Sequence, residues 1–166
     1  VSYPQIAGGN VEEDIIEVIK EYALNPENLC IEMTESRLID MSIPFIRFRR
    51  KLEERRIGFA IDDFGTGYSN LHCISDINPD YVKIDRDFTA KAMNGQRDYE
   101  LLKNIIAMIH SVNAKICVEG IEHRKWCQEM RKLGADSLQG YFFGKPCNEN
   151  DFMVNYVKGA HRCKSL

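Results

Sequence analysis

Two adjacent aspartates, Asp62 and Asp63, follow the apolar run Gly58 to Ile61 and precede a glycine-rich segment at residues 64–69. Like charges a few ångströms apart resist joint ionisation, and burying them costs free energy unless a cation is bound. Carboxylate oxygens are the ligands that Mg²⁺ and Mn²⁺ prefer. We therefore interpret this strand end as one side of a divalent-metal site, with glycines that let the following loop approach a ligand closely.

Polar or ionisable residues also lie at the ends of the other apolar runs. Any one of them alone is more simply explained as a surface charge at a solvated strand end, but their occurrence on successive runs favours a common site. Two metal ions about 3.5 to 4 Å apart would serve phosphodiester hydrolysis, and Lys83 would add a cation near the attacking water or the phosphate. The carboxylates that could hold these ions are Glu32, Asp62, Asp63 and Glu119.

The elements that must position these side chains alternate along the chain. Five apolar runs predict strands: Leu29 to Met33, Gly58 to Ile61, Tyr81 to Ile84, Lys115 to Val118 and Ser137 to Phe143. Amphipathic segments between and after them predict helices: Val11 to Leu24, Ile43 to Arg55, about Asp98 to Val112, Arg124 to Leu133, and Glu149 to Val157. This alternation is typical of a parallel sheet with crossover helices.

An open doubly wound sheet and a (β/α)8 barrel both fit this rhythm. The ring of polar residues at successive strand ends favours the barrel, whose active sites are assembled from the carboxyl ends of several strands. Because side chains alternate along a strand, Val82 and Ile84 should pack under helices while Lys83 points to the opposite face. We therefore predict an α/β fold of the TIM-like (β/α) barrel type.

Composition narrows the setting. The 166 residues suit one domain, 1–166, and 22 basic against 25 acidic residues give a net charge of -3. No global positive field would attract a nucleic-acid polymer, so we expect none as a partner. Six scattered cysteines without metal-ligand spacing, and no apolar stretch of membrane-spanning length, favour a cytoplasmic location, although the parent protein could carry a membrane anchor elsewhere.

Five segments occur in a specific order along nearly the whole chain: residues 31–36 (IEMTES), 61–69 (IDDFGTGYS), 82–85 (VKID), 118–122 (VEGIE) and 139–146 (QGYFFGKP). This succession resembles the motifs of the EAL domain family. The resemblance implies a TIM-like barrel that hydrolyses cyclic di-GMP to linear pGpG in bacterial second-messenger signalling, with two Mg²⁺ or Mn²⁺ ions.

The resemblance also implies a role for each matched residue. Glu32 and Asp62 would be metal ligands, and Asp63 would serve the second metal while anchoring the active-site loop, which Glu35 would hold in shape. Lys83 would position the attacking water. The remaining implied roles are a ligand or base at Glu119, support of the water network at Gln139, and substrate contacts at Asp85, Glu122 and Pro146.

The chain departs from the family pattern at its beginning. The Glu-Ala-Leu signature strand and the Asn of the next strand have no counterpart before Val1, so we expect about six of the eight βα units of such a barrel. As a consequence, this chain alone should be a weak or inactive catalyst unless a second copy supplies the missing wall. The alternative is a catalytically inactive EAL-like module that acts as a cyclic di-GMP receptor or a protein-interaction platform. Other partners that the resemblance implies are a homodimer mate and a GGDEF or sensory domain in the parent protein.

Overall fold

A five-stranded parallel sheet forms the centre of the molecule. The computed structural model describes residues 1–9, 11–34, 43–66, 74 and 76–158. The strands are β1 (Cys30–Thr34), β2 (Gly58–Phe64), β3 (Tyr81–Ile84), β4 (Lys115–Val118) and β5 (Ser137–Leu138). Their order in the sheet is the order in the sequence, and every neighbouring pair is parallel. Each crossover therefore leads to the adjacent strand, as in the wall of a barrel.

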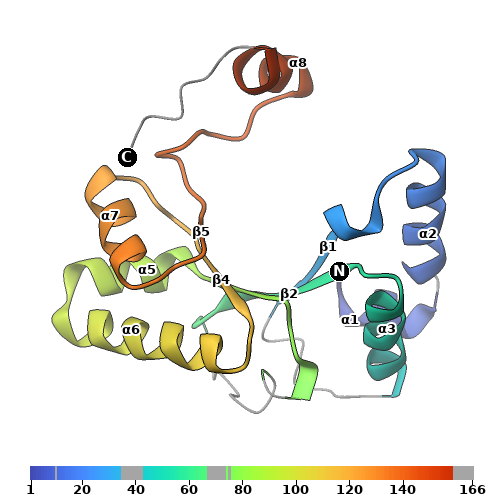
Figure 1. Cartoon of the computed structure of the whole chain (residues 1–166), viewed down its shortest axis with the longest axis horizontal. Coiled ribbons are helices and arrows are strands. Elements are labelled where there is room, and N and C mark those ends of the chain that lie inside the picture. Colours follow the sequence, from blue (N-terminus) through green and yellow to red (C-terminus); the bar gives the residue numbers. More distant parts are fainter. Residues whose placement is uncertain (10, 35–42, 67–73, 75, 159–166) are drawn as a thin grey trace.

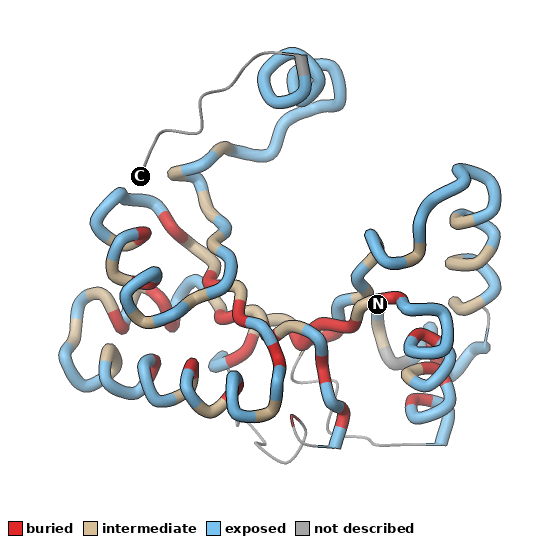
Figure 2. The backbone as a smooth tube through the Cα atoms, in the orientation of Figure 1, coloured by how far each residue is buried: buried red, intermediate tan, exposed pale blue. Residues whose placement is uncertain are grey.

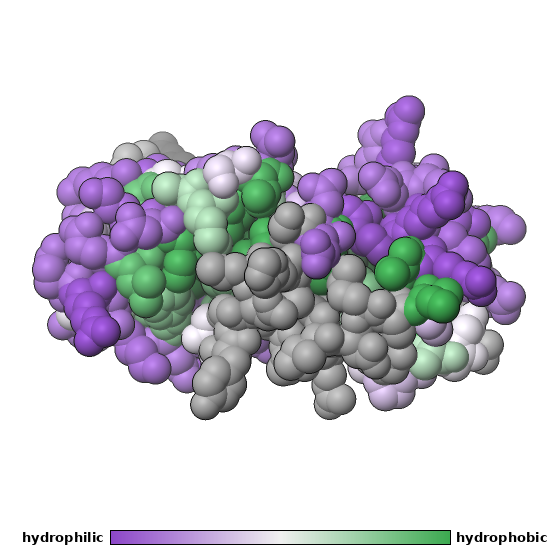
Figure 3. Space-filling view, turned by 90° about the horizontal axis from the view of Figure 1, so that it is seen from below, coloured by the Kyte–Doolittle hydropathy of each residue, from purple (hydrophilic) through white to green (hydrophobic). Residues whose placement is uncertain are grey.

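The helices fall into two groups on either side of Figure 1, with α8 and the following π-helical turn set apart from both. Helices α3 and α6 contact β2 and β4, respectively. Seen from below, hydrophilic side chains cover much of the outer surface, with apolar side chains showing between them (Figure 3). The helical elements are α1 (Tyr3–Gly8), α2 (Val11–Glu21), α3 (Ile43–Glu54), α5 (Arg86–Asn94), α6 (Gln96–Ser111), α7 (Arg124–Lys132), α8 (Glu149–Phe152), the 3-10 turn η1 (Pro26–Asn28) and the π-helical turn η3 (Met153–Lys158).

The two faces of the sheet differ in character. On one face, Val82 and Ile84 of β3 are fully buried in the same core as Leu102 and Ile106 of α6. Figure 2 shows buried backbone along the sheet and on the helix faces turned toward it. On the opposite face Lys83 lines a groove of about 300 Å³ together with residues of all the strands. The predicted alternation in β3 is confirmed.

Several predicted boundaries were wrong. The fifth strand ends at Leu138, not Phe143, because the chain turns at Tyr141 after Gln139 has paired with the loop that follows β4. Helix α5 was not predicted; it begins where the Asp85 carboxylate accepts a hydrogen bond from the Asp87 backbone N–H. Helix α1, with Ser2 and Gln5 in a capping box, was also missed. Among the described residues, no helix is long and apolar enough to cross a bilayer.

Candidate active site

The lysine on β3 gathers carboxylates from three strands. Lys83 Nζ lies 3.1 Å from Glu32 Oε2 of β1, 3.0 Å from Asp62 Oδ1 of β2 and 2.8 Å from Glu119 Oε1, which directly follows β4. Parallel pairing places these residues on one face of the sheet. Glu32 is aligned with Ala60 and Lys83 with Cys117, and Asp62 and Glu119 follow two residues further along. The predicted grouping of Glu32, Asp62, Lys83 and Glu119 is therefore present.

Desolvation and charge act against each other at Lys83, whose side chain is only 12% exposed. Burial alone lowers the pKa of a lysine, but here the carboxylates of Glu119, Asp62 and Glu32 outweigh burial and raise the pKa of Lys83 above its usual range. The ammonium is consequently charged at neutral pH. Lys83 is thus a permanent cation at the centre of the cluster.

One oxygen of the cluster lacks a directed hydrogen bond. Asp62 Oδ1 is buried and receives no hydrogen bond from any described residue, although Lys83 Nζ lies 3.0 Å away as an ion-pair partner. A buried carboxylate oxygen without a directed donor is costly unless a cation provides for it. Asp62 therefore has bonding capacity left for a ligand.

Asp63 is held in an uncommon backbone conformation. Its φ of 56° lies in the left-handed region, which is rare for a residue other than glycine, and its carbonyl accepts a hydrogen bond of 2.9 Å from Thr66 Oγ1. Burial, followed by the charges of Asp62 and Asp85, raises the pKa of Asp63. Asp63 therefore lies near enough to Asp62, a member of the cluster around Lys83, for the two negative charges to repel each other.

Backbone contacts fix the loop that carries Glu119. The Glu119 N–H donates to Ile84 O at 3.0 Å, which continues the ladder between β3 and β4 by one residue. Gly120 then adopts a φ of 73°, and a Cβ at this position would lie 2.9 Å from Arg86 Cα at the start of α5. Glycine is required there because both its backbone angle and its proximity to Arg86 exclude a side chain.

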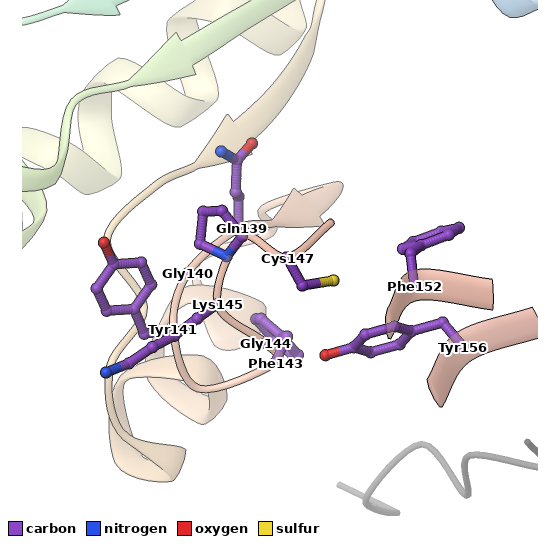
Figure 4. Close-up of a pocket in the computed structure, with 10 residues that line it drawn as sticks. Gln139, Gly140, Tyr141, Phe143, Gly144, Lys145, Cys147, Phe152 and Tyr156 are labelled. Carbon is purple, nitrogen blue, oxygen red and sulfur yellow. The ribbon is translucent and has the colours of Figure 1, made fainter. Parts of the chain in front are cut away.

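Gln139 lines both the groove and a second cavity of about 460 Å³. Ile121 N–H donates to Gln139 O at 3.0 Å, and Phe142 N–H donates to Ile121 O at 3.0 Å, so the two loops form a continuous ladder. In Figure 4 the Tyr156 ring extends toward Gly144, with Phe152 beside it. The Phe152 and Tyr156 rings are stacked with centroids 5.4 Å apart.

The remaining predicted residues have varied positions. Asp85 caps α5, Glu122 is exposed in the loop after β4, and Pro146 lines the second cavity. Glu35 lies outside the described residues. The aromatic side of the second cavity was not predicted, although Phe152 and Tyr156 lie at the i, i+4 spacing that could have indicated it.

The donors around Lys83 suit a hard divalent cation. Among the described residues, no group of three or more His, Cys, Asp or Glu side chains has the spacing of a formed metal site; Lys83 Nζ lies between the carboxylates instead. The donor chemistry nevertheless fits Mg²⁺ or Mn²⁺, because only carboxylate oxygens converge there and Asp62 Oδ1 is buried without a directed donor. Glu32, Asp62 and Glu119 are the residues that would hold such an ion, with Asp63 at its edge.

Fold and site together define a class of protein: part of a TIM-like (β/α) barrel with a carboxylate-rich centre where its strands end. A family model described as the EAL domain matches residues 2–146. The chain belongs to the EAL domain family.

Known relatives match most of this chain. The bifunctional diguanylate cyclase/cyclic di-GMP phosphodiesterase MucR of Pseudomonas aeruginosa is 30% identical over 142 residues, which are 86% of this chain and 21% of that protein. The EAL domain of Mycobacterium smegmatis DcpA superposes with a TM-score of 0.87 at 28% identity, covering 96% of this chain and 71% of that one. A manganese/cyclic di-GMP complex of Klebsiella pneumoniae BlrP1, 23% identical with a TM-score of 0.77 over 84% of this chain and 36% of that one, shares the fold.

This chain is short beside these proteins. It spans about a fifth of the length of MucR, since 21% of that protein is matched. A solved structure of the PaMucR phosphodiesterase in complex with c-di-GMP matches 92% of this chain and 62% of its own, with a TM-score of 0.84 and 29% identity. The remaining segments of these relatives are not matched by this chain.

Proposed function

We propose that this chain carries the strand-end carboxylates of a cyclic di-GMP phosphodiesterase, which hydrolyses cyclic di-GMP to linear pGpG with divalent cations. The observation that carries the proposal is the convergence of Glu32, Asp62 and Glu119 on Lys83 Nζ within 3.1 Å. Membership of the EAL family and the phosphodiesterase activity named for MucR support it. An anionic substrate cannot approach such an acidic cluster unless cations offset the charge.

In the proposed reaction a water oxygen attacks one phosphorus of the cyclic dinucleotide, and the bond to the leaving sugar oxygen breaks. Bound Mg²⁺ or Mn²⁺ would supply charge neutralisation at the phosphate. Glu119, with its side chain 18% exposed, accepts the proton of the attacking water, and the leaving oxygen takes a proton from a solvent water as it departs. Lys83 orients the water, and Gln139 completes the hydrogen bonds at the rim.

The second cavity suits a nucleobase of the substrate. It shares Gln139 with the groove that Lys83 lines, is itself lined by Pro146, Phe152 and Tyr156, and has a volume of about 460 Å³. Flat aromatic rings stack on purine bases, and each such contact contributes about 1–3 kcal/mol. A guanine in this cavity would place the adjoining phosphate near the carboxylates. Asp85 and Glu122 are proposed to contact the substrate from the loops that follow β3 and β4, and Glu35 to support the active-site loop.

The chain alone is proposed to be a weak catalyst that needs further barrel wall. The groove beside Lys83 is lined by Cys30, Ala60 and Tyr81, residues of the sheet face that would be enclosed in a closed barrel. The DcpA EAL domain extends beyond the matched region, since 71% of it is covered. Further proposed partners are a second copy of the chain and a signalling domain in the same protein. An example of such a domain is one with the diguanylate cyclase activity named for MucR.

Product analysis with radiolabelled cyclic di-GMP and Mn²⁺ tests this function. The chain is compared with a chimera in which the unmatched N-terminal part of the MucR EAL domain is fused before Val1. We expect linear pGpG from the chimera and little from the chain alone. Binding of cyclic di-GMP by the chimera without any pGpG would contradict hydrolysis and favour the receptor alternative. Equal, strong hydrolysis by the chain alone would contradict the need for added barrel wall.

A further inference from the structure

A single ammonium is the common ion-pair partner of three carboxylates. Lys83 of β3 reaches Glu32 of β1, Asp62 of β2 and the residue after β4, Glu119, so its contacts span four neighbouring strands. Its side chain is 12% exposed, whereas that of Glu32 is 45% exposed. The lysine is therefore the more deeply buried partner and lies at the middle of the cluster.

The negative charges would repel one another strongly without this lysine. Three ionised carboxylates and one ammonium leave an excess negative charge, and Asp62 and Glu119 are 22% and 18% exposed, so water screens them poorly. Removing one partner of a buried ion pair leaves an uncompensated charge, which is strongly destabilising. Lys83 thus compensates the cluster when no metal ion is present.

The same oxygens are needed by the divalent cation of the proposed function, on which this inference rests. Lys83 contacts Glu32 Oε2, Asp62 Oδ1 and Glu119 Oε1 at 2.8 to 3.1 Å, whereas Mg²⁺ requires oxygen ligands at about 2.0–2.1 Å in near-octahedral geometry. A carboxylate oxygen has a second lone pair, but an ammonium and a divalent cation at the same oxygen repel each other, so the two cations compete for this position. The buried Asp62 Oδ1 receives no directed hydrogen bond from the described residues, so it is the oxygen that can most easily exchange the ammonium for a metal ion.

We propose that Lys83 is the internal counter-ion of the metal-free site, and that divalent cations bind by displacing its ammonium from the carboxylates. The lysine thereby keeps the strand ends together before metal arrives, and it lowers the affinity for the metal. Its position within the cluster, and not only a later contact with water, would then set the metal concentration at which the site fills.

Calorimetric titration with Mn²⁺ alone, without nucleotide, tests the competition. Lys83→Met removes the charge but keeps much of the side-chain length, Lys83→Arg keeps the charge, and Lys91→Met removes an exposed lysine of α5. We expect Lys83→Met to bind Mn²⁺ about tenfold more tightly than the unaltered chain. Lys91→Met should bind Mn²⁺ with the affinity of the unaltered chain. Lys83→Arg should bind more weakly than Lys83→Met. Unfolding temperatures in chelator should fall for Lys83→Met and rise more on adding Mn²⁺.

The outcomes separate the two proposals. Unchanged or weaker Mn²⁺ binding by Lys83→Met, with normal binding by the unaltered chain, would overturn the counter-ion role and leave the proposed function standing. Absence of Mn²⁺ binding in every variant would overturn the metal site and the competition together. If Lys83→Met fails to fold, the Lys83 side-chain NMR signal of the unaltered chain decides. It should shift as Mg²⁺ saturates the site, and an unmoved signal would overturn displacement.

Discussion

Lys83 Nζ and Glu119 Oε1 lie 2.8 Å apart across the neighbouring strands β3 and β4. The contact depends on the parallel register, because Ile84 is paired with Val118 and the Glu119 N–H donates to Ile84 O. Any change that shifts one strand end by a residue would turn one of the two side chains to the other face of the sheet. The chemistry of this site is therefore coupled to how the strand ends and their loops are held.

Gly140→Ala should damage the loop ladder beside the site. A Cβ at Gly140 would overlap the backbone of Ile121, whose N–H and carbonyl bond to Gln139 and Phe142. Backbone cannot move aside as a flexible side chain can, so we expect a loss of about 2 kcal/mol or more in the free energy of unfolding. Urea unfolding measures it. Gly8→Ala, where a Cβ meets nothing within 4 Å, is the matched control; equal losses in both would refute this explanation.

The carboxylate of Asp136, near the amino ends of β4 and β5, should make the stability of the fold depend on pH. Its Oδ2 accepts hydrogen bonds from the Ile116 N–H at 2.8 Å and faces His110 Nε2 at 2.9 Å. Burial alone raises the pKa of Asp136, but these two partners outweigh it and lower the pKa below its ordinary value. The ionised form therefore stabilises the fold above about pH 3.9, the ordinary value, and this contribution is lost as the pH falls through the lower folded-state pKa.

Asp136→Asn keeps an acceptor for Ile116 but removes the charge. Its melting temperature should lie below that of the unaltered chain at pH 7, and the two should converge as the pH falls below about 4. Thermal unfolding followed by circular dichroism at several pH values measures this difference. Asp14→Asn on the exposed side of α2 should show no such convergence. A constant difference between Asp136→Asn and the unaltered chain at all pH values would rule out the charge as its cause.

Tyr156→Ala should weaken substrate binding more than turnover. The ring lines the second cavity and stacks on Phe152 at 5.4 Å, away from the carboxylates at Lys83. Loss of one aromatic contact with a base corresponds to about a tenfold rise in KM. Steady-state kinetics of the MucR chimera give KM and kcat separately. Tyr156→Phe should retain the unaltered KM, as should Tyr22→Ala, whose ring is 64% exposed after α2. If Tyr156→Ala lowered kcat and left KM unchanged, the result would contradict a role of this cavity in substrate binding.

Much of the site could be predicted because strand periodicity and parallel pairing decide it. Val82 and Ile84 identify the buried face of β3, and alternation then places Lys83 on the opposite face beside residues of its neighbours. The strand β5 was predicted too long because the apolar residues after Gln139 are compatible with either a strand or a turn. The close approach of Gly140 to Ile121, which decides for the turn, is a long-range contact that no local pattern reveals.

The role of Lys83 as the shared ion-pair partner of the carboxylates could not be predicted from the sequence either. Its residue type indicated a cation near water or phosphate, but three ion pairs within 3.1 Å depend on distances between strands. Helix α5 was missed because only Gly95 separates its nine residues from Gln96 of α6, so the start of α6 and the whole of α5 resemble one polar connection. Capping by Asp85 was the available signal, and it was assigned to the substrate site instead.

Hydrolysis of cyclic di-GMP by Asp62→Asn, compared with the unaltered protein, tests the central claim most directly. Asn keeps the size of the side chain and removes the charge of the oxygen that lies 3.0 Å from Lys83 Nζ. With the MucR chimera in saturating Mn²⁺, we predict a loss of at least about 100-fold in the rate of pGpG formation, with Asp14→Asn unchanged. Equal rates for Asp62→Asn and the unaltered chimera would contradict a metal-dependent site built on Asp62.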